Sequence, residues 1–174
     1  MVSRRSLLVG SALLLVLLGV VLTSGTLGLG TAEPVVTLEN QDDATYYVTA
    51  YTVEDADAAG FLNFEVRTED GERRIVTYEE LVWPGEYRNV TLVDDGIDGR
   101  SFVVEPGETT TKTIDGWSRG EMTIYIVERG PERNHTSSRT ITCGRRGQTH
   151  SLTLEPTGSG GSSTCAGGFG WLFR

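Results

Sequence analysis

Two cysteines carry the most readily specified chemistry in this sequence. Cys143 ends a segment of alternating polar and apolar side chains, and Cys165 lies in a Gly/Ser-rich stretch near the C-terminus. In an exported chain, two cysteines favour a Cys143–Cys165 disulfide, which closes a loop of about 23 residues and restricts the unfolded chain by about 3 kcal/mol. Two separate thiols are one alternative. Pairing between two copies of the protein through the tail cysteine is another.

Cys143 also belongs to a set of potential copper ligands. With His135, His150 and Met122 it supplies the ligand types of a blue-copper site, and such sites occur on β-sandwiches. Blue-copper proteins share a compact run of Cys, His and Met at the end of the domain. Here His150 follows Cys143 by seven residues and no methionine comes later. The spacing argues against copper, and we predict no cofactor.

A carboxylate-rich segment resembles a calcium-binding loop. Asp94, Asp98 and Glu105 match positions one, five and twelve of that pattern, with Gly99 at position six. Gly96 occupies position three and has no side-chain ligand, and the flanking segments are typical of strands rather than of EF-hand helices. Because Asp-Gly pairs are also ordinary turn residues, we expect a plain hairpin turn here. Calcium binding by Asp94, Asp98 and Glu105 is the weaker alternative.

Catalytic motifs are scarce. A Ser-His-Asp hydrolase needs a histidine placed against a nucleophile, and the chain has only two histidines, both in polar, turn-like contexts. The sequence contains no G-x-S-x-G elbow, P-loop or H-E-x-x-H helix. Solvation explains the many carboxylates, although a glycosidase pair stays open. We therefore predict a non-enzymatic protein.

Two sequons could carry N-linked glycans. They begin at Asn89, followed by Val and Thr91, and at Asn134, followed by His and Thr136. Asn134 is the better candidate because it lies in a polar loop, whereas Asn89 opens an expected strand. Chance occurrence of both sequons is the alternative.

The N-terminus predicts export. Arg4 and Arg5 precede an uncharged apolar stretch at 7–29, long enough to span a bilayer, and resemble the start of a twin-arginine signal. We expect residues 1–32 to anchor the protein in the membrane, with everything that follows outside. Secretion after cleavage near Ala32 is the alternative.

Charge narrows the possible partners. Beyond residue 32 there are 24 acidic residues and 13 basic ones, 15 minus Arg4 and Arg5, which gives −11. Nucleic acid is therefore excluded as a partner. Lys112 is the only lysine, and this bias toward arginine and carboxylates resembles proteins of halophilic archaea. An ordinary acidic surface is the alternative.

Short alternating segments bounded by Gly, Pro or Asp predict about ten strands. We expect them at 35–38, 45–53, 61–66, 75–76, 87–93, 101–104, 109–114, 122–127, 139–143 and 150–154, with one helical turn at 78–82. The turn at 40–43 should join the first two strands into a hairpin, and Asp70-Gly71 the next two. This spacing predicts an all-β, antiparallel sandwich in which each strand buries one apolar face.

Two phrases carry a family resemblance. VEPGETTTKTIDGW and VTLENQDDATYYVTAY resemble turn-and-strand phrases of exported immunoglobulin-like modules of halophilic archaea. The resemblance implies an immunoglobulin-like β-sandwich over residues 33–156 and implies little about activity.

The C-terminal segment has a different composition. Residues 157–174 are rich in Gly and Ser and end in the apolar side chains Phe169, Trp171, Leu172 and Phe173. We expect a flexible tail whose end could dock on the sandwich, touch lipid or contact another protein.

Together these features predict a non-enzymatic, membrane-anchored binding or structural module of the cell envelope, with an envelope protein as a possible partner. One alternative is an exported small-ligand or calcium-binding protein that uses the loop at 94–105. Another is an accessory subunit of a membrane complex.

Overall fold

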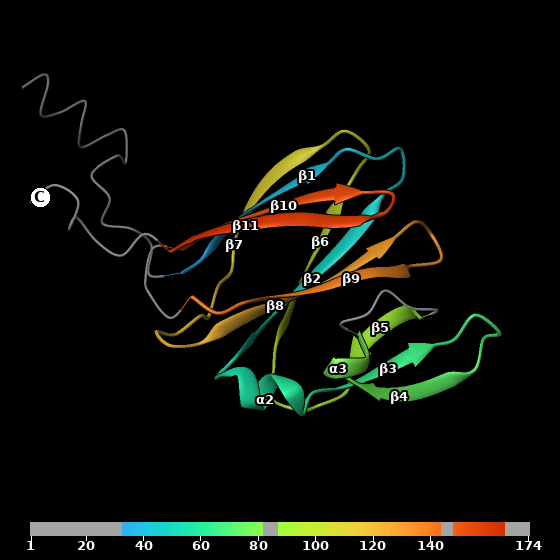
Figure 1. Ribbon diagram of the computed structural model, residues 1–174, viewed down its shortest axis with the longest axis horizontal. Helices are drawn as coiled ribbons and strands as arrows, with labels where there is room; N and C mark the ends of the chain where they lie inside the picture. Colours follow the sequence, from blue (N-terminus) through green and yellow to red (C-terminus); the bar gives the residue numbers. More distant parts are fainter. Residues whose placement is uncertain (1–32, 82–86, 144–147, 166–174) are drawn as a thin grey trace, which may run out of the picture. The chain divides into compact units, whose positions relative to one another are not determined.

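The computed structural model describes residues 33–81, 87–143 and 148–165, which form two β-sheets and two short helices (Figure 1). In chain order the elements are β1 (Val35–Asn40), β2 (Tyr46–Val53), α2 (Ala56–Gly60), β3 (Asn63–Arg67), β4 (Arg73–Thr77), α3 (Tyr78–Leu81), β5 (Arg88–Leu92), β6 (Gly99–Val104), β7 (Thr109–Thr113), β8 (Met122–Arg129), β9 (Asn134–Ile141), β10 (Gln148–Glu155) and β11 (Gly158–Cys165).

The two sheets pack face to face as a sandwich. The smaller sheet has the strand order β11-β10-β1-β7, and the larger has the order β4-β3-β5-β9-β8-β2-β6. The pairing of β1 with β10 is parallel, so the prediction of a wholly antiparallel sandwich is wrong at this pair. Arg88 and Asn134 are the single registered pair between β5 and β9 in the described residues, so the larger sheet divides into a β4-β3-β5 part and a β9-β8-β2-β6 part.

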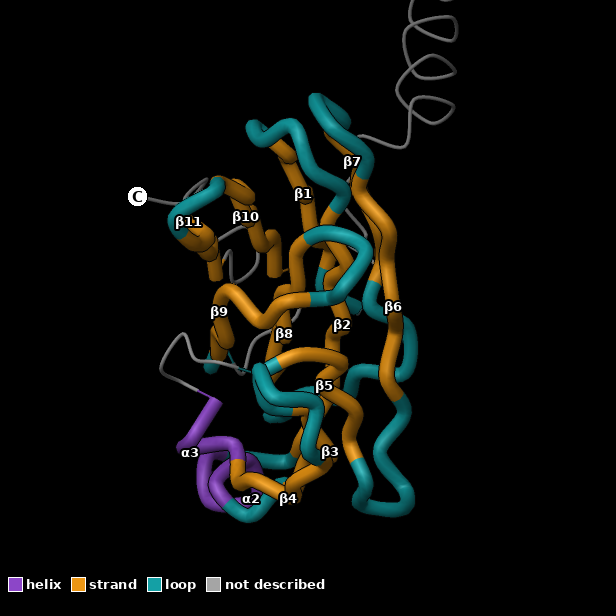
Figure 2. Tube along the Cα trace, turned by 90° about the vertical axis from the view of Figure 1, so that its right-hand side faces the viewer, coloured by secondary structure: helices purple, strands orange, loops and turns teal. Residues whose placement is uncertain are grey.

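Two apolar cores lie on opposite faces of β2 and β8, which stand between the smaller sheet and the β3–β5 region (Figure 2). The inter-sheet core consists of Val36, Leu38, Tyr46, Val48, Ala50, Val104, Ile114, Tyr125, Val127, Leu152 and Leu154. The outer core consists of Tyr51, Val53, Ala59, Leu62, Phe64, Val66, Val76, Tyr78, Leu81, Val90, Met122, Ile124 and Ile126. β8 is therefore buried on both faces, which explains its unbroken apolar run and departs from the expected single apolar face.

The second predicted hairpin is confirmed. β3 and β4 pair antiparallel from Asn63 with Thr77 to Arg67 with Arg73. Gly71 adopts a φ of 86° in the turn, a conformation that costs glycine little because it has no Cβ. The predicted helical turn is present as α3.

The first predicted hairpin is wrong, because β1 and β2 belong to different sheets. The buried side chain of Asn40 holds the crossing between them. Its amide nitrogen lies 2.8 Å from the Ala44 carbonyl oxygen and 3.1 Å from that of Val104, and its oxygen accepts from the Asp42 backbone N–H. Side-chain hydrogen bonds thus replace the backbone ladder that a hairpin would supply.

The predicted hairpin around Asp94 and Asp98 is also wrong. β5 pairs with β3 and β9, whereas β6 pairs with β2 at the far edge of the larger sheet. The connection from β5 to β6 is therefore a crossover. Ile97 packs on the outer core and so anchors this crossover on the sheet.

Part of the segment predicted to be a flexible tail is a strand. β11 pairs antiparallel with β10 along its whole length, from Gly158 opposite Glu155 to Cys165 opposite Gln148. The aromatic end and the N-terminal apolar segment lie outside the described residues, and the domain boundaries at 32 and 156 stay predictions. Within residues 33–81, 87–143 and 148–165, no helix is long and apolar enough to cross a bilayer.

Candidate functional site

A polar groove runs between β9 of the larger sheet and β11 of the smaller sheet. It consists of two adjoining hollows of about 280 and 520 Å³. Their walls are formed by Thr136, Ser137, Ser138, Arg139, Thr140 and Ile141 on β9, by Leu152 and Glu155 on β10, and by Thr157 and residues 158–163. We call this feature the β9–β11 groove.

The register of the strands explains why the groove is polar. Arg139 lies opposite Tyr125 of β8, whose side chain belongs to the inter-sheet core, so Arg139 also faces the smaller sheet. On that sheet, Ser159 and Gly161 lie opposite the core residues Leu154 and Leu152. The space between the two sheets is thus lined by small and polar side chains, rather than apolar ones, at the edge where β9 lies near β11.

Hydrogen bonds cross the groove where its two hollows adjoin. The hydroxyl oxygens of Ser137 and Ser159 lie 2.5 Å apart. The Arg139 guanidinium donates from Nε to Ser159 Oγ over 3.2 Å and from Nη2 to the Ser159 carbonyl oxygen. Within the described part of the chain no ion pair includes Arg139. Its charge therefore has no salt-bridge partner among the described residues, although Glu155 also lines the larger hollow.

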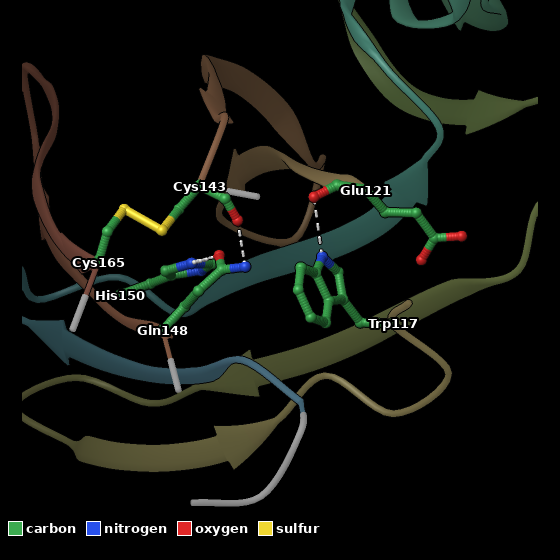
Figure 3. Close-up of a disulfide and its surroundings, with 6 residues drawn as sticks. All are labelled: Trp117, Glu121, Cys143, Gln148, His150 and Cys165. Atoms are coloured by element: carbon green, nitrogen blue, oxygen red, sulfur yellow. Dashed lines mark hydrogen bonds between the residues drawn. A yellow bond between two sulfur atoms is a disulfide. The ribbon is translucent and has the colours of Figure 1, made fainter. Parts of the chain in front are cut away.

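A disulfide joins the same two segments on the far side of the smaller hollow. Cys143 and Cys165 are bonded, with their Cα atoms 5.8 Å apart, and this is the pairing that the sequence favours. Gln148 donates from its side-chain amide to the Cys143 carbonyl oxygen (Figure 3). The disulfide and these hydrogen bonds thus bracket the smaller hollow, which fixes the distance between β9 and β11 along it.

A buried polar chain connects the disulfide to the inter-sheet core. His150 Nε2 lies 3.0 Å from Gln148 Oε1, and its Nδ1 lies 2.6 Å from the Tyr125 hydroxyl (Figure 3 shows Gln148 and His150). Because an amide oxygen can only accept, Nε2 carries the proton and Nδ1 accepts from Tyr125. Burial lowers the pKa of His150 to about 4, so the imidazole is neutral at pH 7. The neutral imidazole thus joins Gln148 to Tyr125 by hydrogen bonds inside the fold.

The second histidine lies beside the groove. His135 Nε2 is 2.9 Å from the hydroxyl of Ser138, which lines both hollows, and burial lowers the pKa of His135 to about 4. His135 Nδ1 has no partner among the described residues. The nearby Glu128 carboxylate instead accepts from Val90 N–H and pairs with Arg133 at 2.6 Å. Glu128 therefore does not orient His135 in the way that the carboxylate of a catalytic triad orients its histidine.

The structure does not bring together the residues of the calcium-loop pattern. Asp94 accepts from the backbone N–H of Asn63 at 2.6 Å, whereas Glu105 accepts from the hydroxyl of Thr45 at 2.8 Å. Asp98 borders a separate hollow. Among the described residues, no group of three His, Cys, Asp or Glu side chains could hold a metal ion.

The residues weighed as copper ligands are likewise dispersed. Met122 belongs to the outer core, Cys143 is in the disulfide, and the two histidines have the separate partners described above. Sequence reasoning missed Arg139, Ser137 and Ser159. A single arginine within a run of small polar residues was the one available signal for the groove, because the approach of β9 to β11 is set by tertiary packing.

The two sequons lie side by side. Asn134 begins β9 opposite Arg88 of β5, and the backbone N–H of Asn89 donates to the Arg133 carbonyl oxygen at 3.1 Å. Both asparagine side chains are exposed. Asn89 adopts a φ of 51°, in the left-handed region that asparagine tolerates better than most residues. Glycosylation at either position stays a prediction.

Comparison with known proteins identifies the family. In structure the chain is similar to the T6SS lipoprotein TssJ1 from Pseudomonas aeruginosa, with a TM-score of 0.43 and 17% identity over 78% of this chain and 98% of that one. A structure titled "Trapped Toxin" matches with a TM-score of 0.32 and 9% identity, over 77% of this chain and 23% of that one. No curated protein matches the chain in sequence. A family model described as halobacterial Ig domain protein matches residues 1–174, and the chain therefore belongs to this family, as the two phrases in its sequence imply.

Proposed function

We propose that this protein is a non-enzymatic module of the cell envelope, outside the cytoplasmic membrane, that binds a partner in the β9–β11 groove. The observation that carries the proposal is the groove itself, whose walls are hydroxyl-rich and whose single arginine has no carboxylate partner in the described part of the chain. Recognition sites combine such a recess with a few fixed polar groups. Residues 1–32 anchor the module in the membrane.

Two further features support an extracytoplasmic location. The Cys143–Cys165 disulfide is a crosslink typical of oxidising compartments. The charged start followed by the apolar stretch at 7–29 is typical of a segment that directs a chain into or across a membrane. A binding role rather than catalysis is supported by the partners of Glu128, which leave His135 without an orienting carboxylate.

The binding role is tested by site-specific photo-crosslinking in the native host. A photoreactive residue replaces Ser162, an exposed residue of β11 that lines the smaller hollow. The control replaces Thr113, an exposed residue of β7 at the opposite edge of the same sheet. We expect one defined adduct from position 162 and none from position 113. Equal adducts from both positions, or none from either, would refute the groove as the binding site.

The anchor is tested by the intact mass of the protein, isolated from native membranes without reductant. Retention of residues 1–32, a mass two hydrogens below that of the dithiol, and extraction by detergent but not by carbonate are expected for an anchored, oxidised module. A chain trimmed near Ala32 and found in the medium would instead indicate a secreted protein. Added hexose would report occupancy of Asn89 or Asn134.

A further inference from the structure

The edge of β11 on which no described strand pairs offers backbone hydrogen bonds to the groove. The Leu154 carbonyl oxygen of β10 accepts from Gln41 N–H at 3.0 Å, on the side of β1 and so away from β11. Leu154 and Ser159, which lie opposite each other, are therefore a non-hydrogen-bonded pair, and the backbone N–H and C=O of Ser159 point away from β10. Because this direction repeats every second residue along a strand, the backbone N–H and C=O groups of Gly161 and Ser163 also point away from β10.

Of these outward groups, one already has a partner from β9. The Ser159 carbonyl oxygen accepts from Arg139, which confirms that it points toward the groove. Gly161 and Ser163 line the smaller hollow between this contact and the disulfide. The groove therefore presents N–H and C=O groups at the two-residue spacing of an extended strand.

The sequence of β11 carries none of the side chains that usually protect an edge strand. Natural sheet edges carry charges, prolines or bulges that prevent pairing with another chain. Arg73 and Arg74 lie on the edge strand β4, Arg100 on β6 and Lys112 on β7. The sequence of β11, GSGGSSTC, contains no charge and no proline.

Arg139 defines the side chain that an incoming strand should carry. Of the described residues that line the smaller hollow it is the only charged one, whereas Glu155 lies in the larger hollow. Two of its five N–H donors are used on Ser159, and the other three have no partner among the described residues. A carboxylate matches both the charge and the planar geometry of guanidinium.

We propose that the β9–β11 groove takes an extended acidic polypeptide segment, whose backbone pairs with Gly161 and Ser163 and whose carboxylate binds Arg139. This inference rests on the proposed function and names the chemistry of its partner. A polypeptide fits better than a sugar because the free groups repeat at strand spacing along one edge.

The test uses the full-length protein in detergent at a constant 2 M KCl. The probes are three fluorescein-labelled nonapeptides of alternating Thr with Asp, Asn or Lys, and binding is followed by fluorescence anisotropy. The variants are Arg139→Gln, which removes the guanidinium, and Ser163→Pro, which removes an N–H that β10 does not use. Arg100→Gln on β6 is the matched control, since Arg100 is exposed and on an edge strand of the other sheet. Thermal melting confirms that each variant is folded.

The Asp peptide should bind about tenfold more tightly than the Asn peptide, as expected for a charge-assisted hydrogen bond. Arg139→Gln should abolish that difference, Ser163→Pro should prevent binding of both peptides, and Arg100→Gln should change neither. If the peptides still bind the Ser163→Pro variant, they do not pair with the backbone of β11. If all three peptides bind equally, Arg139 does not recognise a carboxylate. If position 162 crosslinks a partner in cells but neither the Asp nor the Asn peptide binds, this inference fails and the proposed function stands. Binding of maltohexaose by the groove in place of the peptides also overturns it.

Discussion

At the scale of single residues, a partly buried ion pair lies at the crossing from β1 to β2. The buried Asp42 carboxylate accepts from Arg129 Nε at 2.5 Å and from the Tyr46 hydroxyl at 2.9 Å. The Arg129 guanidinium holds the pKa of Asp42 well below its usual range, against the opposing effect of burial. Burial, followed by the neighbouring Asp42, raises the pKa of Tyr46. The carboxylate therefore depends on Arg129 to remain charged inside the fold.

Removing this guanidinium should destabilise the protein. We expect Arg129→Gln to lower the free energy of unfolding by about 2 kcal/mol, because Asp42 loses charge-assisted hydrogen bonds while it stays buried. Guanidinium chloride unfolding followed by circular dichroism measures the change. Arg73→Gln serves as the control, since Arg73 pairs with Glu65 at the surface over 3.5 Å, and it should cost less than about 0.5 kcal/mol.

Acid should destabilise the fold through its histidines. Burial lowers the pKa of both His135 and His150 to about 4, whereas an unfolded histidine titrates near 6.5. Between these values the unfolded state binds more protons, so stability is fully present above pH 6.5 and falls as the pH drops toward 4. The expected loss is about 2 to 3 kcal/mol per histidine at pH 4.5, on the order given by the shift.

Unfolding midpoints at pH 7.0, 5.5 and 4.5 test this dependence. Burial raises the pKa of Glu128, which has the opposite sign and favours the folded state as the pH falls, so the net loss should be smaller than the sum for the two histidines. A His150→Gln variant should show a shallower decline than the native chain. A midpoint independent of pH over this range would contradict the burial of the imidazoles.

At the scale of elements, local sequence patterns predict strands better than their partners. The segments with strong alternation became β1 to β8 and β10, and the Asp70-Gly71 turn joins β3 to β4 as expected. α2 was missed because it has only five residues, although Asp55 caps it by accepting from Ala58 N–H. β11 was missed because glycine and serine have weak strand propensity, and only the ladder to β10 makes this segment extended.

Glycine at position 161 is required by the close approach of β11 to its neighbours. A Cβ atom there would lie 2.9 Å from Leu152 Cδ2 and 3.2 Å from the Ser151 carbonyl oxygen. We expect Gly161→Ala to cost about 1 to 3 kcal/mol of stability, as overpacking of a filled site does. Gly160→Ala is the control, because a Cβ atom there meets nothing closer than 3.9 Å. Equal effects in denaturant unfolding would contradict the packing described for β11.

The disulfide should contribute stability mainly by restricting the unfolded chain. Cys143 and Cys165 are separated by 22 residues, and loss of a crosslink of this length costs about 3 kcal/mol in the loop-entropy model. A Cys143→Ser, Cys165→Ser variant should unfold at correspondingly lower denaturant. Amide exchange in β11 should accelerate more than in β8. Uniform acceleration would show that β11 does not depend on the crosslink.

At the scale of the whole molecule, the sequence predicts a sandwich but not that the β4-β3-β5 part of the larger sheet forms a second apolar core on the other face of β2 and β8. Phe64 and Val66 are recognisably inward-facing residues, yet their partners Ile124 and Ile126 lie on a strand that was expected to serve one core only. The groove was equally hidden, since Arg139 and Ser159 are 20 residues apart and meet only when two sheets pack. Long-range packing of this kind has no signature in local periodicity.

The acidic surface should make stability depend on salt. The chain carries a formal charge of −9, and molar salt reduces the screening length to about 3 Å. We expect the melting temperature to rise by at least about 4 °C between 0.1 and 2 M KCl, which corresponds to about 1 kcal/mol or more. Replacing the exposed Glu54, Glu69 and Glu79 with glutamine should reduce this dependence. A melting temperature that does not change with KCl would contradict the halophilic interpretation.

The burial of β8 on both faces has a consequence for how its pairing is specified. In a strand with one apolar face, a slip by one residue is prevented because it would expose apolar side chains to water. In β8 a slip would merely exchange Ile124 and Ile126 with Tyr125 and Val127 between two apolar cores. The polar groups must then select the register. Tyr125 can bond His150 only from the face of β8 that turns toward the smaller sheet, and Glu128 bonds Arg133 from the opposite face. These few buried hydrogen bonds therefore fix the register of the strand that both cores share.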